Sequence, residues 1–351
     1  MVASQILGYC RPGFEADAGL ELQTRAAEHG FYGYFKAERL SGFYLFECPQ
    51  SLQPLFKRLA LTQLIFTRQW LQVLAHYDNL SKDDRLSDLT DSFAELPVIS
   101  EVRVEHPDTE DGKELSRFCR KFTVPLRQAL KQRKLYQESK GLTCLFAFFV
   151  KSTGCYLGIT PMNNISPLPG GIMRLKFPAE SPSRSTLKLD EAFLTFIPEK
   201  EREERLRAGL NAVDLGACPG GWTYQLVRRG MFVQAVDNGL MAESLMDSGQ
   251  VTHFQEDGFK FKPRKKNIHW LVCDMIEQPQ KVARLMAQWV SDDWCKEAMF
   301  NLKLPMKKRF ESVLECLAII AEVLPGKLEL SAKHLYHNRD EITVHLKKQE
   351  K

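Results

Sequence analysis

Two charged residues lie where the sequence is otherwise apolar, and both could take part in chemistry. Lys303 interrupts the run MFNLKLP, and Asp274 directly follows the run IHWLVC. A charged side chain is costly to bury unless it is paired or has a chemical task. In an α/β sheet, ligands bind at the carboxyl ends of the strands, which is where Asp274 falls. We therefore single out both as candidate functional residues.

A glycine-rich stretch, DLGACPGG at residues 214–221, separates an apolar run from an amphipathic one. Glycine lets the backbone approach a ligand closely, and the N-terminus of the helix that follows would face that ligand. The spacing differs from the dinucleotide fingerprint G-x-G-x-x-G, and no Gly-Lys-Ser/Thr follows as in a phosphate-binding loop. Asp237 ends the next apolar run, about 20 residues further on, where a carboxylate can accept hydrogen bonds from ribose hydroxyls.

The elements that must position these residues can be read from residue 211 onward, where apolar runs alternate with amphipathic helical patterns. The apolar runs are NAVDL, MFVQAVDN, IHWLVCDM and EAMFNLKL. This alternation is typical of parallel strands with crossover helices, so we expect a doubly wound, Rossmann-like α/β sheet that is mostly parallel. The last helix should run from about Met306 to Leu324. The tail runs KLELSAKHL and EITVHLKK should form an antiparallel hairpin at the sheet edge.

The first half of the chain has a different pattern. ILGYC, a helical stretch at residues 16–29, FYGYFK and FYLFEC follow the β-α-β-β order of a small α+β module. A second unit holds the strand VISEVRVE, a basic helix from Gly112 to about Leu135, and the hairpin TCLFAFFVKSTGCYLGIT. A stretch rich in Pro, Gly and Ser then precedes the α/β half. We expect modules at residues 1–80 and 81–160, a linker at 161–182 and an α/β domain at 183–351.

Composition restricts the class of protein. The chain has 351 residues, of which 44% are hydrophobic and 26% are charged, so we expect a globular protein of two or three domains. The N-terminal residues do not resemble a secretory signal, and the cytoplasm is the expected location. Nine scattered cysteines without a C-x-x-C pair argue against a disulfide framework and against a zinc site. The net charge of +4 does not by itself indicate a nucleic-acid partner.

Several motifs of the chain occur together in one family. They are PLPGGIMRLKFP, SRSTLKLDEAF, VDLGACPGGWTYQLVRRG, VCDM, NLKLPMKKR and HNRDEITVH. In this order they resemble the bacterial Rossmann-like RNA ribose methyltransferases, whose fold is shared with the heat-shock RNA methyltransferases. The resemblance covers essentially the whole chain. It implies methylation of the 2′-hydroxyl of a cytidine in 23S ribosomal RNA, with S-adenosylmethionine as the cofactor.

The resemblance also implies a Lys-Asp-Lys-Glu tetrad formed by Lys188, Asp274, Lys303 and Glu341. Following the family, Lys303 is the general base, Lys188 lowers its pKa or binds the reacting oxygen, and the two carboxylates orient the lysines. A ribose hydroxyl is a poor nucleophile and needs a positioned base and alignment with the methyl donor. A lysine can be that base only if its pKa falls, which a neighbouring ammonium favours and carboxylates oppose.

The cofactor site implied by the same resemblance includes eight residues: Ser185, Cys218, Pro219, Gly220, Gly221, Asp237, Asp257 and Asp274. The loop residues 218–221 should contact the methionine portion through backbone groups, and Asp257 should lie near the adenine. Ser185 should lie near the methionine end, although its place before TLKLDEA equally fits a simple helix N-cap. We expect Cys218 to be a packing residue rather than a nucleophile.

Two basic segments are candidates for RNA contact. Residues 113–134 hold eight basic residues and one acidic residue, a pattern that also fits the solvated face of an ordinary amphipathic helix. The run FKFKPRKKN at residues 259–267 alternates aromatic and basic side chains, which suits base stacking and phosphate contact. By resemblance, the first half combines a ferredoxin-like module with a THUMP-type RNA-binding module. The expected partner is 23S ribosomal RNA, as RNA or assembly intermediate, with monomer and dimer both open.

Other functions remain open at this stage. A cytosine-C5 RNA methyltransferase also uses a Pro-Gly-Gly loop but needs a cysteine nucleophile, usually beside a proline, and the chain has no Pro-Cys dipeptide. An amine methyltransferase would need an Asn/Asp-Pro-Pro-aromatic turn, which Asp274-Met275-Ile276 is not. A non-catalytic RNA-binding assembly factor could keep the same fold. His334 and His337 lack an evident third ligand, so we expect no metal site there.

Overall fold

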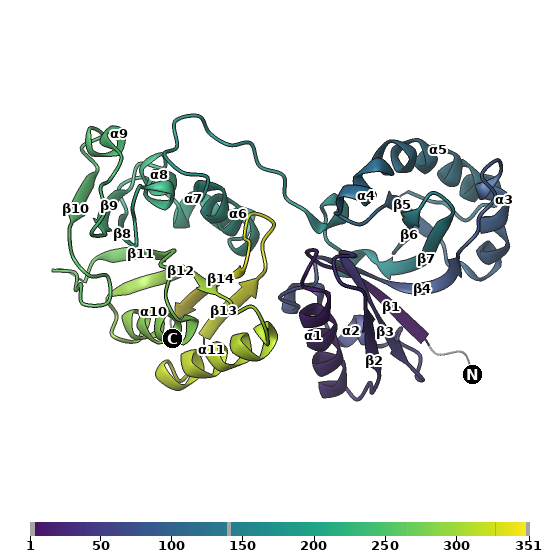
Figure 1. Cartoon of the computed structure of the whole chain (residues 1–351), viewed down its shortest axis with the longest axis horizontal. Helices are drawn as coiled ribbons and strands as arrows, with labels where there is room; N and C mark the ends of the chain where they lie inside the picture. The colour runs from purple at the N-terminus through teal and green to yellow at the C-terminus, as the bar shows by residue number, and fades with distance from the viewer. Residues whose placement is uncertain (1–3, 139–141, 265, 327, 349–351) are drawn as a thin grey trace. The chain divides into compact units, whose positions relative to one another are not determined.

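The computed structural model describes residues 4–138, 142–264, 266–326 and 328–348. The chain divides into two compact units, Met1–Ile172 (unit 1) and Met173–Lys351 (unit 2). Each unit is built around its own seven-stranded sheet (Figure 1). The two halves therefore have separate cores, as expected from their different sequence patterns.

The first part of unit 1 has the predicted β-α-β-β order. Its elements are β1 (Ser4–Tyr9), α1 (Glu15–Glu28), β2 (Tyr34–Ala37), β3 (Phe43–Cys48), α2 (Leu55–Arg58) and the 3-10 turn η1 (Leu61–Gln63). Acidic side chains lie in the first turn of α1, where they favour the positive end of the helix dipole. Gly30, with φ +84°, then lets the chain turn away towards β2. α1 packs against β2 and β3.

The second part of unit 1 continues the same sheet. Its elements are β4 (Gln69–Tyr77), α3 (Arg85–Thr90), η2 (Asp91–Glu95), β5 (Ile99–Glu105), α4 (Glu110–Glu114), α5 (Ser116–Gln132), β6 (Thr143–Lys151), β7 (Gly154–Pro161), η3 (Met162–Asn164) and η4 (Pro169–Gly171). The strand order is β2-β3-β1-β4-β7-β6-β5. Because β4 pairs with both β1 and β7, the two expected modules share one continuous sheet.

The first part of the Pro- and Gly-rich stretch packs into unit 1. The buried Asn164 side chain accepts a hydrogen bond from Leu61 N at 2.7 Å and donates to the carbonyl oxygens of Phe56 and Leu59 at 2.7 and 2.9 Å. These bonds fix the segment after β7 against α2 and η1. The boundary between the units falls later, between Ile172 and Met173.

Unit 2 has the predicted doubly wound arrangement. Its elements are α6 (Thr186–Phe196), α7 (Glu199–Arg205), β8 (Asn211–Leu215), α8 (Gly221–Val227), β9 (Phe232–Val236), α9 (Glu243–Met246), β10 (Val251–Phe254), β11 (Ile268–Cys273), α10 (Pro279–Ser291), β12 (Cys295–Lys303), α11 (Arg309–Val323), β13 (Leu328–Lys333) and β14 (Glu341–Lys348). The strand order is β10-β9-β8-β11-β12-β14-β13. The first five strands pair in parallel and the last two form the antiparallel hairpin, so the predicted fold class is confirmed.

Helices cover both faces of this sheet. α10 and α11 pack together on one face, and α6, α7 and α8 lie over the other (Figure 1). Beneath α6 and α8 the core contains Phe193 and Trp270, whose rings meet edge to face at 5.2 Å. Since the central strands are parallel, the carboxyl ends of β8, β9, β11 and β12 meet at one edge of the sheet.

Two details differ from the prediction. The short edge strand β10 and the single-turn helix α9 occupy a stretch for which no element had been predicted. α11 begins at Arg309 rather than near Met306, because Lys308 adopts a left-handed conformation with φ 56°. The strand-like tail run is described from Leu328, since Lys327 lies outside the described residues.

Candidate active site

The four predicted tetrad residues come from three neighbouring strands and one helix. Lys188 lies in the first turn of α6, and Asp274 directly follows β11. Lys303 is the last residue of β12 and pairs in register with Glu341, the first residue of β14. β11 and β12 are adjacent parallel strands, so their carboxyl ends bring Asp274 beside Lys303.

The structure brings the four side chains into one ring of alternating charge. Asp274 lies between the lysines, with Oδ1 2.7 Å from Lys303 Nζ and Oδ2 3.1 Å from Lys188 Nζ. Glu341 closes the ring, with Oε1 2.7 Å from Lys188 Nζ and Oε2 3.5 Å from Lys303 Nζ. Each carboxylate thus contacts both lysines, and the longest contact belongs to Lys303.

The ring is mostly buried, and Lys303 is its most exposed member. The side chain of Lys303 is 22% exposed, compared with 16% for Lys188, 14% for Asp274 and 7% for Glu341. Burial lowers the pKa of Lys188, but the charges of Asp274 and Glu341 outweigh burial and hold this pKa above its ordinary value. Lys188 is therefore a stable ammonium group, which leaves Lys303 as the more accessible and less tightly paired lysine.

Asp274 is held as a carboxylate by its neighbours. Burial raises the pKa of Asp274, but the charges of Lys188 and Lys303 together with the hydrogen bonds from Lys303 and Asn301 lower it below the usual range. Asn301 Nδ2 donates to Asp274 Oδ1 at 2.8 Å, a contact that the sequence reasoning missed. A polar residue two positions before Lys303 in a buried strand was the available signal, since residues i and i+2 share a strand face.

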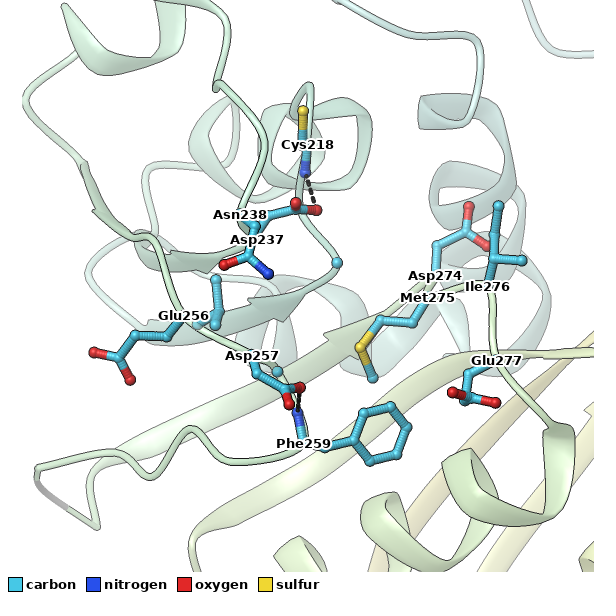
Figure 2. A pocket seen from close by; sticks show the side chains of 13 residues that line it. Cys218, Asp237, Asn238, Glu256, Asp257, Phe259, Asp274, Met275, Ile276 and Glu277 are labelled. Atoms are coloured by element: carbon cyan, nitrogen blue, oxygen red, sulfur yellow. Dashed lines mark hydrogen bonds between the residues drawn. The ribbon is translucent and has the colours of Figure 1, made fainter.

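A pocket of about 420 Å³ adjoins the tetrad at the carboxyl ends of β8, β9 and β11 (Figure 2). Its lining residues are Gly216, Cys218, Val236, Asp237, Asn238, Glu256, Asp257, Gly258, Phe259, Asp274, Met275, Ile276 and Glu277. Asp274 belongs both to this lining and to the ring of charges. A ligand in the pocket would therefore lie next to Lys188 and Lys303.

The predicted cofactor residues divide into two groups. Four of them line the pocket, namely Cys218, Asp237, Asp257 and Asp274. The other four, Ser185, Pro219, Gly220 and Gly221, are not among the lining residues. The other nine lining residues had not been named as cofactor residues, although Gly216 belongs to the predicted ligand loop and Phe259 to the predicted basic segment.

Asp237 organises the loop that carries Cys218. Its Oδ2 accepts a hydrogen bond from the backbone N–H of Cys218 at 3.0 Å (Figure 2), and its Oδ1 accepts one from the backbone N–H of Gly239 at 2.8 Å. Each carboxylate oxygen has a second lone pair, so both remain able to accept from a ligand hydroxyl. The Cys218 thiol lies 2.9 Å from the carbonyl oxygen of Leu240, which fits the packing role predicted for it.

The glycines of the loop are required mainly by packing inside the protein. Gly220 has φ +115°, and a Cβ there would lie 2.2 Å from Leu245 Cδ1. A Cβ on Gly221 would lie 2.1 Å from Ser185 Oγ, so this glycine allows α8 to approach the start of α6. Gly216, in contrast, lines the pocket, and a Cβ there would lie 2.5 Å from Met275 Cγ.

Ser185 occupies the N-cap position of α6 but makes no capping hydrogen bond to the helix. Its hydroxyl instead donates to Ser183 Oγ at 3.1 Å. The simple capping role that competed with ligand binding in the sequence is therefore not supported by the geometry. Ser185 lies against Gly221, beside the loop rather than in the pocket lining.

The pocket fits the predicted cofactor in size and in charge. Its volume lies within the range of about 300 to 1,000 Å³ typical of small-molecule sites. Carboxylates of Asp237, Glu256 and Asp257 suit ribose hydroxyls and positive charge, while Phe259 and Met275 offer apolar surface to a base. Gly216 lines the pocket with backbone alone, and a Cβ there would meet Met275.

The basic segment after the pocket is only partly available for stacking. Phe259 is exposed, but Phe261 is buried and packs against Phe254 and Trp289. Lys262 lies over the Trp294 ring, and Lys266 donates to the carbonyl oxygen of Asp292. Lys265, part of the same predicted segment, lies outside the described residues. Among the described aromatic side chains of this segment, Phe259 alone remains a candidate for contact with a base.

The residues that the structure describes hold neither a candidate metal cluster nor a candidate membrane-spanning helix. Over the described ranges, no group of three or more His, Cys, Asp or Glu side chains is arranged to hold a metal ion. His334, considered above, has its Nε2 2.9 Å from the carbonyl oxygen of Arg339. None of the helices in the described part of the chain is both long enough and apolar enough to cross a membrane.

Family models match three successive stretches of the chain. One described as "RlmM ferredoxin-like domain" matches residues 3–71, and one described as "Ribosomal RNA large subunit methyltransferase M, N-terminal" matches residues 84–160. A third, described as "FtsJ-like methyltransferase", matches residues 182–314 and so includes the pocket, Lys188, Asp274 and Lys303. Glu341 lies beyond that match.

Curated proteins called ribosomal RNA large subunit methyltransferase M are similar over almost the full length of the chain. The relative from Pseudoalteromonas atlantica is 53% identical over 347 residues, 97% of this chain and 98% of that protein. Those from Shewanella amazonensis and Shewanella loihica are 54% and 53% identical over 346 residues, 96% of this chain in both cases and 96% and 95% of the relatives.

Proposed function

The chain belongs to the ribosomal RNA large subunit methyltransferase M family, and on this premise we propose that it methylates the 2′-hydroxyl of a cytidine ribose in 23S ribosomal RNA, with S-adenosylmethionine as methyl donor. The observation that carries the ribose assignment is the ring of two lysines and two carboxylates beside the pocket. Such a ring can place a base and a fixed positive charge next to one hydroxyl group.

The pocket residues are assigned to the cofactor. Asp237 and Asp257 would accept hydrogen bonds from its hydroxyl and amino groups, Cys218 and Gly216 would give backbone approach, and Asp274 belongs both to the pocket lining and to the tetrad. When bound, S-adenosylmethionine supplies an electrophilic methyl group carried by a sulfonium sulfur. Ser185 and residues 219–221 are assigned to the methionine portion of the cofactor, and the close approach of Gly221 to Ser185 holds the loop against the start of α6.

Lys303 is the proposed general base. In its neutral form, its Nζ accepts the proton of the ribose hydroxyl as the oxygen gains the methyl group. Lys188 remains an ammonium ion, since Asp274 and Glu341 hold its pKa high, and it stabilises negative charge that develops on the oxygen. Asp274 and Glu341 orient both lysines, and the longest contact of the ring is the 3.5 Å one between Glu341 and Lys303.

The cysteines near the pocket argue against a cytosine-C5 mechanism, which needs a thiolate nucleophile. Cys273 is buried, and burial raises its pKa to about 12. Cys218 lines the pocket, but desolvation and the charge of Asp237 raise its pKa as well. Both thiols therefore stay protonated near neutral pH, which favours the ribose oxygen as the methyl acceptor.

We assign RNA recognition chiefly to unit 1, with residues 1–80 as the ferredoxin-like module and 81–160 as the THUMP-type module. Residues 161–182 connect them to the catalytic domain at 183–351. The exposed basic residues of α5 support this assignment. The RNA is proposed to be 23S ribosomal RNA, free or in an assembly intermediate.

Mass spectrometry of the modified RNA tests the reaction. The protein is incubated with 23S ribosomal RNA and S-adenosylmethionine carrying an isotope-labelled methyl group, and nuclease fragments are then analysed. We expect the label on a cytidine ribose. A label on the base, or no label at all, would overturn the proposed function.

Replacement of the proposed base tests its role. Lys303→Ala should lower the single-turnover rate of methyl transfer by about 100-fold or more, the usual contribution of a general base. Cofactor binding, measured by calorimetry, should stay within about twofold of the original protein. Lys296→Ala is the matched control, because Lys296 is an exposed lysine near the opposite end of the same strand. Methyl transfer that persists in Lys303→Ala would refute the assignment of the base.

A further inference from the structure

The carboxylate shared by the two lysines has a further donor from the core of the sheet. Asn301 is fully buried in β12, and its Nδ2 donates to Asp274 Oδ1, the same oxygen that contacts Lys303. A buried amide is costly unless all its groups are paired. Asn301 Oδ1 is paired as well, since it accepts from the hydroxyl of Thr343 at 2.7 Å.

The hydrogen bonds beyond Asn301 all donate towards Asp274. Asn338 Nδ2 donates to Thr343 Oγ1 at 3.0 Å, and all three side chains, Asn301, Thr343 and Asn338, have no exposed surface. The Thr343 hydroxyl has a second possible acceptor in Asn338 Oδ1, but at 3.4 Å this contact is longer than the one to Asn301. The donors therefore run from Asn338 through Thr343 and Asn301 to the carboxylate.

The negative charge of Asp274 fixes the direction of all the hydrogen bonds in this series. If the Asn301 amide were turned over, its oxygen would face Asp274 Oδ1, and two acceptors would meet without a proton between them. The observed orientation is thus the one that a carboxylate imposes. It leaves Asn301 Oδ1 as an acceptor, which in turn directs the hydroxyl proton of Thr343.

Strand register explains why this chain of hydrogen bonds lies beside the tetrad. Asn301 pairs with Thr343 across β12 and β14, just as Lys303 pairs with Glu341. Residues two apart in a strand point to the same face. The same pairing that brings Glu341 to Lys303 therefore brings Thr343 to Asn301.

We propose that Asn301, held by Thr343 and Asn338, is a positioning residue for methyl transfer. It fixes the rotation of the Asp274 carboxylate, so that Oδ1 faces Lys303 while Oδ2 faces Lys188. Without the amide, the carboxylate can turn between the two lysines, and Lys303 loses its alignment. This inference rests on the proposed function, because it assigns Asn301 a part in that reaction without contact to substrate or cofactor.

The first test replaces Asn301 by a residue of similar shape. Asn301→Leu should lower the single-turnover rate at saturating RNA and cofactor by about 10- to 100-fold, because misplacement of a reacting group by about 1 Å has effects of this size. The dissociation constants for S-adenosylmethionine and RNA should change by less than about twofold. A structural defect alone would instead lower the melting temperature and weaken binding along with the rate.

The second test uses a pair of variants at Thr343. Thr343→Val keeps the shape but removes the hydroxyl, and we expect a rate about fivefold lower, as for the loss of one buried hydrogen bond. Thr343→Ser restores the donor and should return the rate to within about twofold of the original. This pair also tests the proposal if Asn301→Leu does not fold.

Three outcomes would overturn the proposal. They are an unchanged rate in Asn301→Leu, equal rates in Thr343→Ser and Thr343→Val, and a loss that appears only as weaker cofactor or RNA binding. Each rate is compared with that of the original protein, whichever atom of the RNA carries the methyl group. A product on the base would therefore refute the ribose assignment without deciding the role of Asn301.

Discussion

The unusual protonation of Asp214 shows how the site is built residue by residue. This aspartate, the first residue of DLGACPGG, is 1% exposed, and its Oδ2 accepts a hydrogen bond from Thr223 Oγ1 at 2.6 Å. Burial raises its pKa to about 7, and the negative charge of Asp274 adds to the rise against the effect of the Thr223 bond. Asp214 does not line the pocket but belongs to the scaffold behind it. Near pH 7, a substantial fraction of the protein molecules carries a neutral Asp214.

This raised pKa predicts a specific dependence of stability on pH. An unfolded aspartate has a pKa of about 3.9. Between about pH 4 and pH 7 the folded protein holds more protons at Asp214 than the unfolded chain, so the free energy of unfolding falls as the pH rises. The stabilising contribution is complete below about pH 4 and lost above about pH 7. Asp214→Asn removes this dependence, and its melting temperature above pH 7 should exceed that of the original protein by a few degrees.

Thermal unfolding measured between pH 5 and pH 8 checks this expectation. Asparagine keeps an oxygen for the Thr223 hydroxyl, so the variant tests charge more than hydrogen bonding. Asp247→Asn is the control, because Asp247 is exposed and its replacement should leave the pH dependence nearly unchanged. Parallel melting curves for Asp214→Asn and the original protein across this range would contradict the prediction.

At the scale of elements, the turn into α8 requires a glycine at position 220. Its φ of +115° is strained for any residue with a Cβ, and a Cβ would also lie 2.2 Å from Leu245 Cδ1. Gly209, before β8, has a similar φ of +80° but no neighbouring atom within 4 Å of such a Cβ. Replacement of Gly209 therefore measures backbone strain alone, whereas replacement of Gly220 measures backbone strain together with a steric clash.

We expect Gly209→Ala to cost about 1 kcal/mol, the usual penalty for a left-handed non-glycine residue. Gly220→Ala should cost at least about 2 kcal/mol more, because Leu245 or the loop must move. It should also weaken binding of S-adenosylmethionine, since the neighbouring Cys218 lines the pocket. Chemical denaturation and calorimetry measure both effects, and equal costs for the two variants would refute the role given to Leu245.

The same elements show which parts of the site could be predicted from sequence. Lys303 and Asp274 were predictable because each is a charge at the end of an apolar strand, and parallel strands collect such ends at one edge. Asn301 was not, because its meaning depends on its neighbours Asp274 and Thr343, which are fixed by long-range strand pairing. The local sequence pattern predicts which face of a strand a residue lies on, but its partner on the neighbouring strand is known only once the strand register is known.

Other features could not be derived from the local sequence for equally physical reasons. The four residues of β10, VTHF, are too few and too polar to show a strand pattern, and they pair only at the sheet edge with β9. The assignment of the glycines at 220 and 221 to cofactor contact stays a prediction, while a Cβ at these positions would meet Leu245 and Ser185. A glycine in the sequence indicates that something approaches the backbone closely, but it does not distinguish a ligand from another part of the protein.

At the scale of the whole molecule, the proposed RNA-binding surface and the proposed catalytic site lie in different units. The pocket and tetrad lie within unit 2, while the longest basic helix, α5, lies within unit 1. α5 buries Cys119, Phe122 and Leu126 against its sheet, so its apolar face serves the core. Arg117, Arg120 and Lys121 are exposed on the helix surface. This division predicts that changes to α5 affect RNA affinity and leave the chemical step intact.

Charge reversal on α5 tests that division. Lys121→Glu should weaken binding of 23S ribosomal RNA by about fivefold or more at low salt, and it should reduce the slope of log affinity against log salt by about one. The single-turnover rate at saturating RNA and the affinity for S-adenosylmethionine should not change. Lys57→Glu, an exposed lysine on α2, makes the same change in net charge elsewhere on unit 1.

The control decides between two roles of the basic face. If α5 contacts phosphates directly, Lys121→Glu loses more affinity than Lys57→Glu, because a contact acts over a few ångströms, whereas net charge acts weakly beyond a Debye length of about 8 Å at physiological salt. If both variants lose affinity equally, the face is only the solvated side of an amphipathic helix, and the RNA is recognised elsewhere. Filter-binding measurements at several salt concentrations distinguish these results. If α5 contacts phosphates directly, the slope of log affinity against log salt becomes smaller for Lys121→Glu but not for Lys57→Glu.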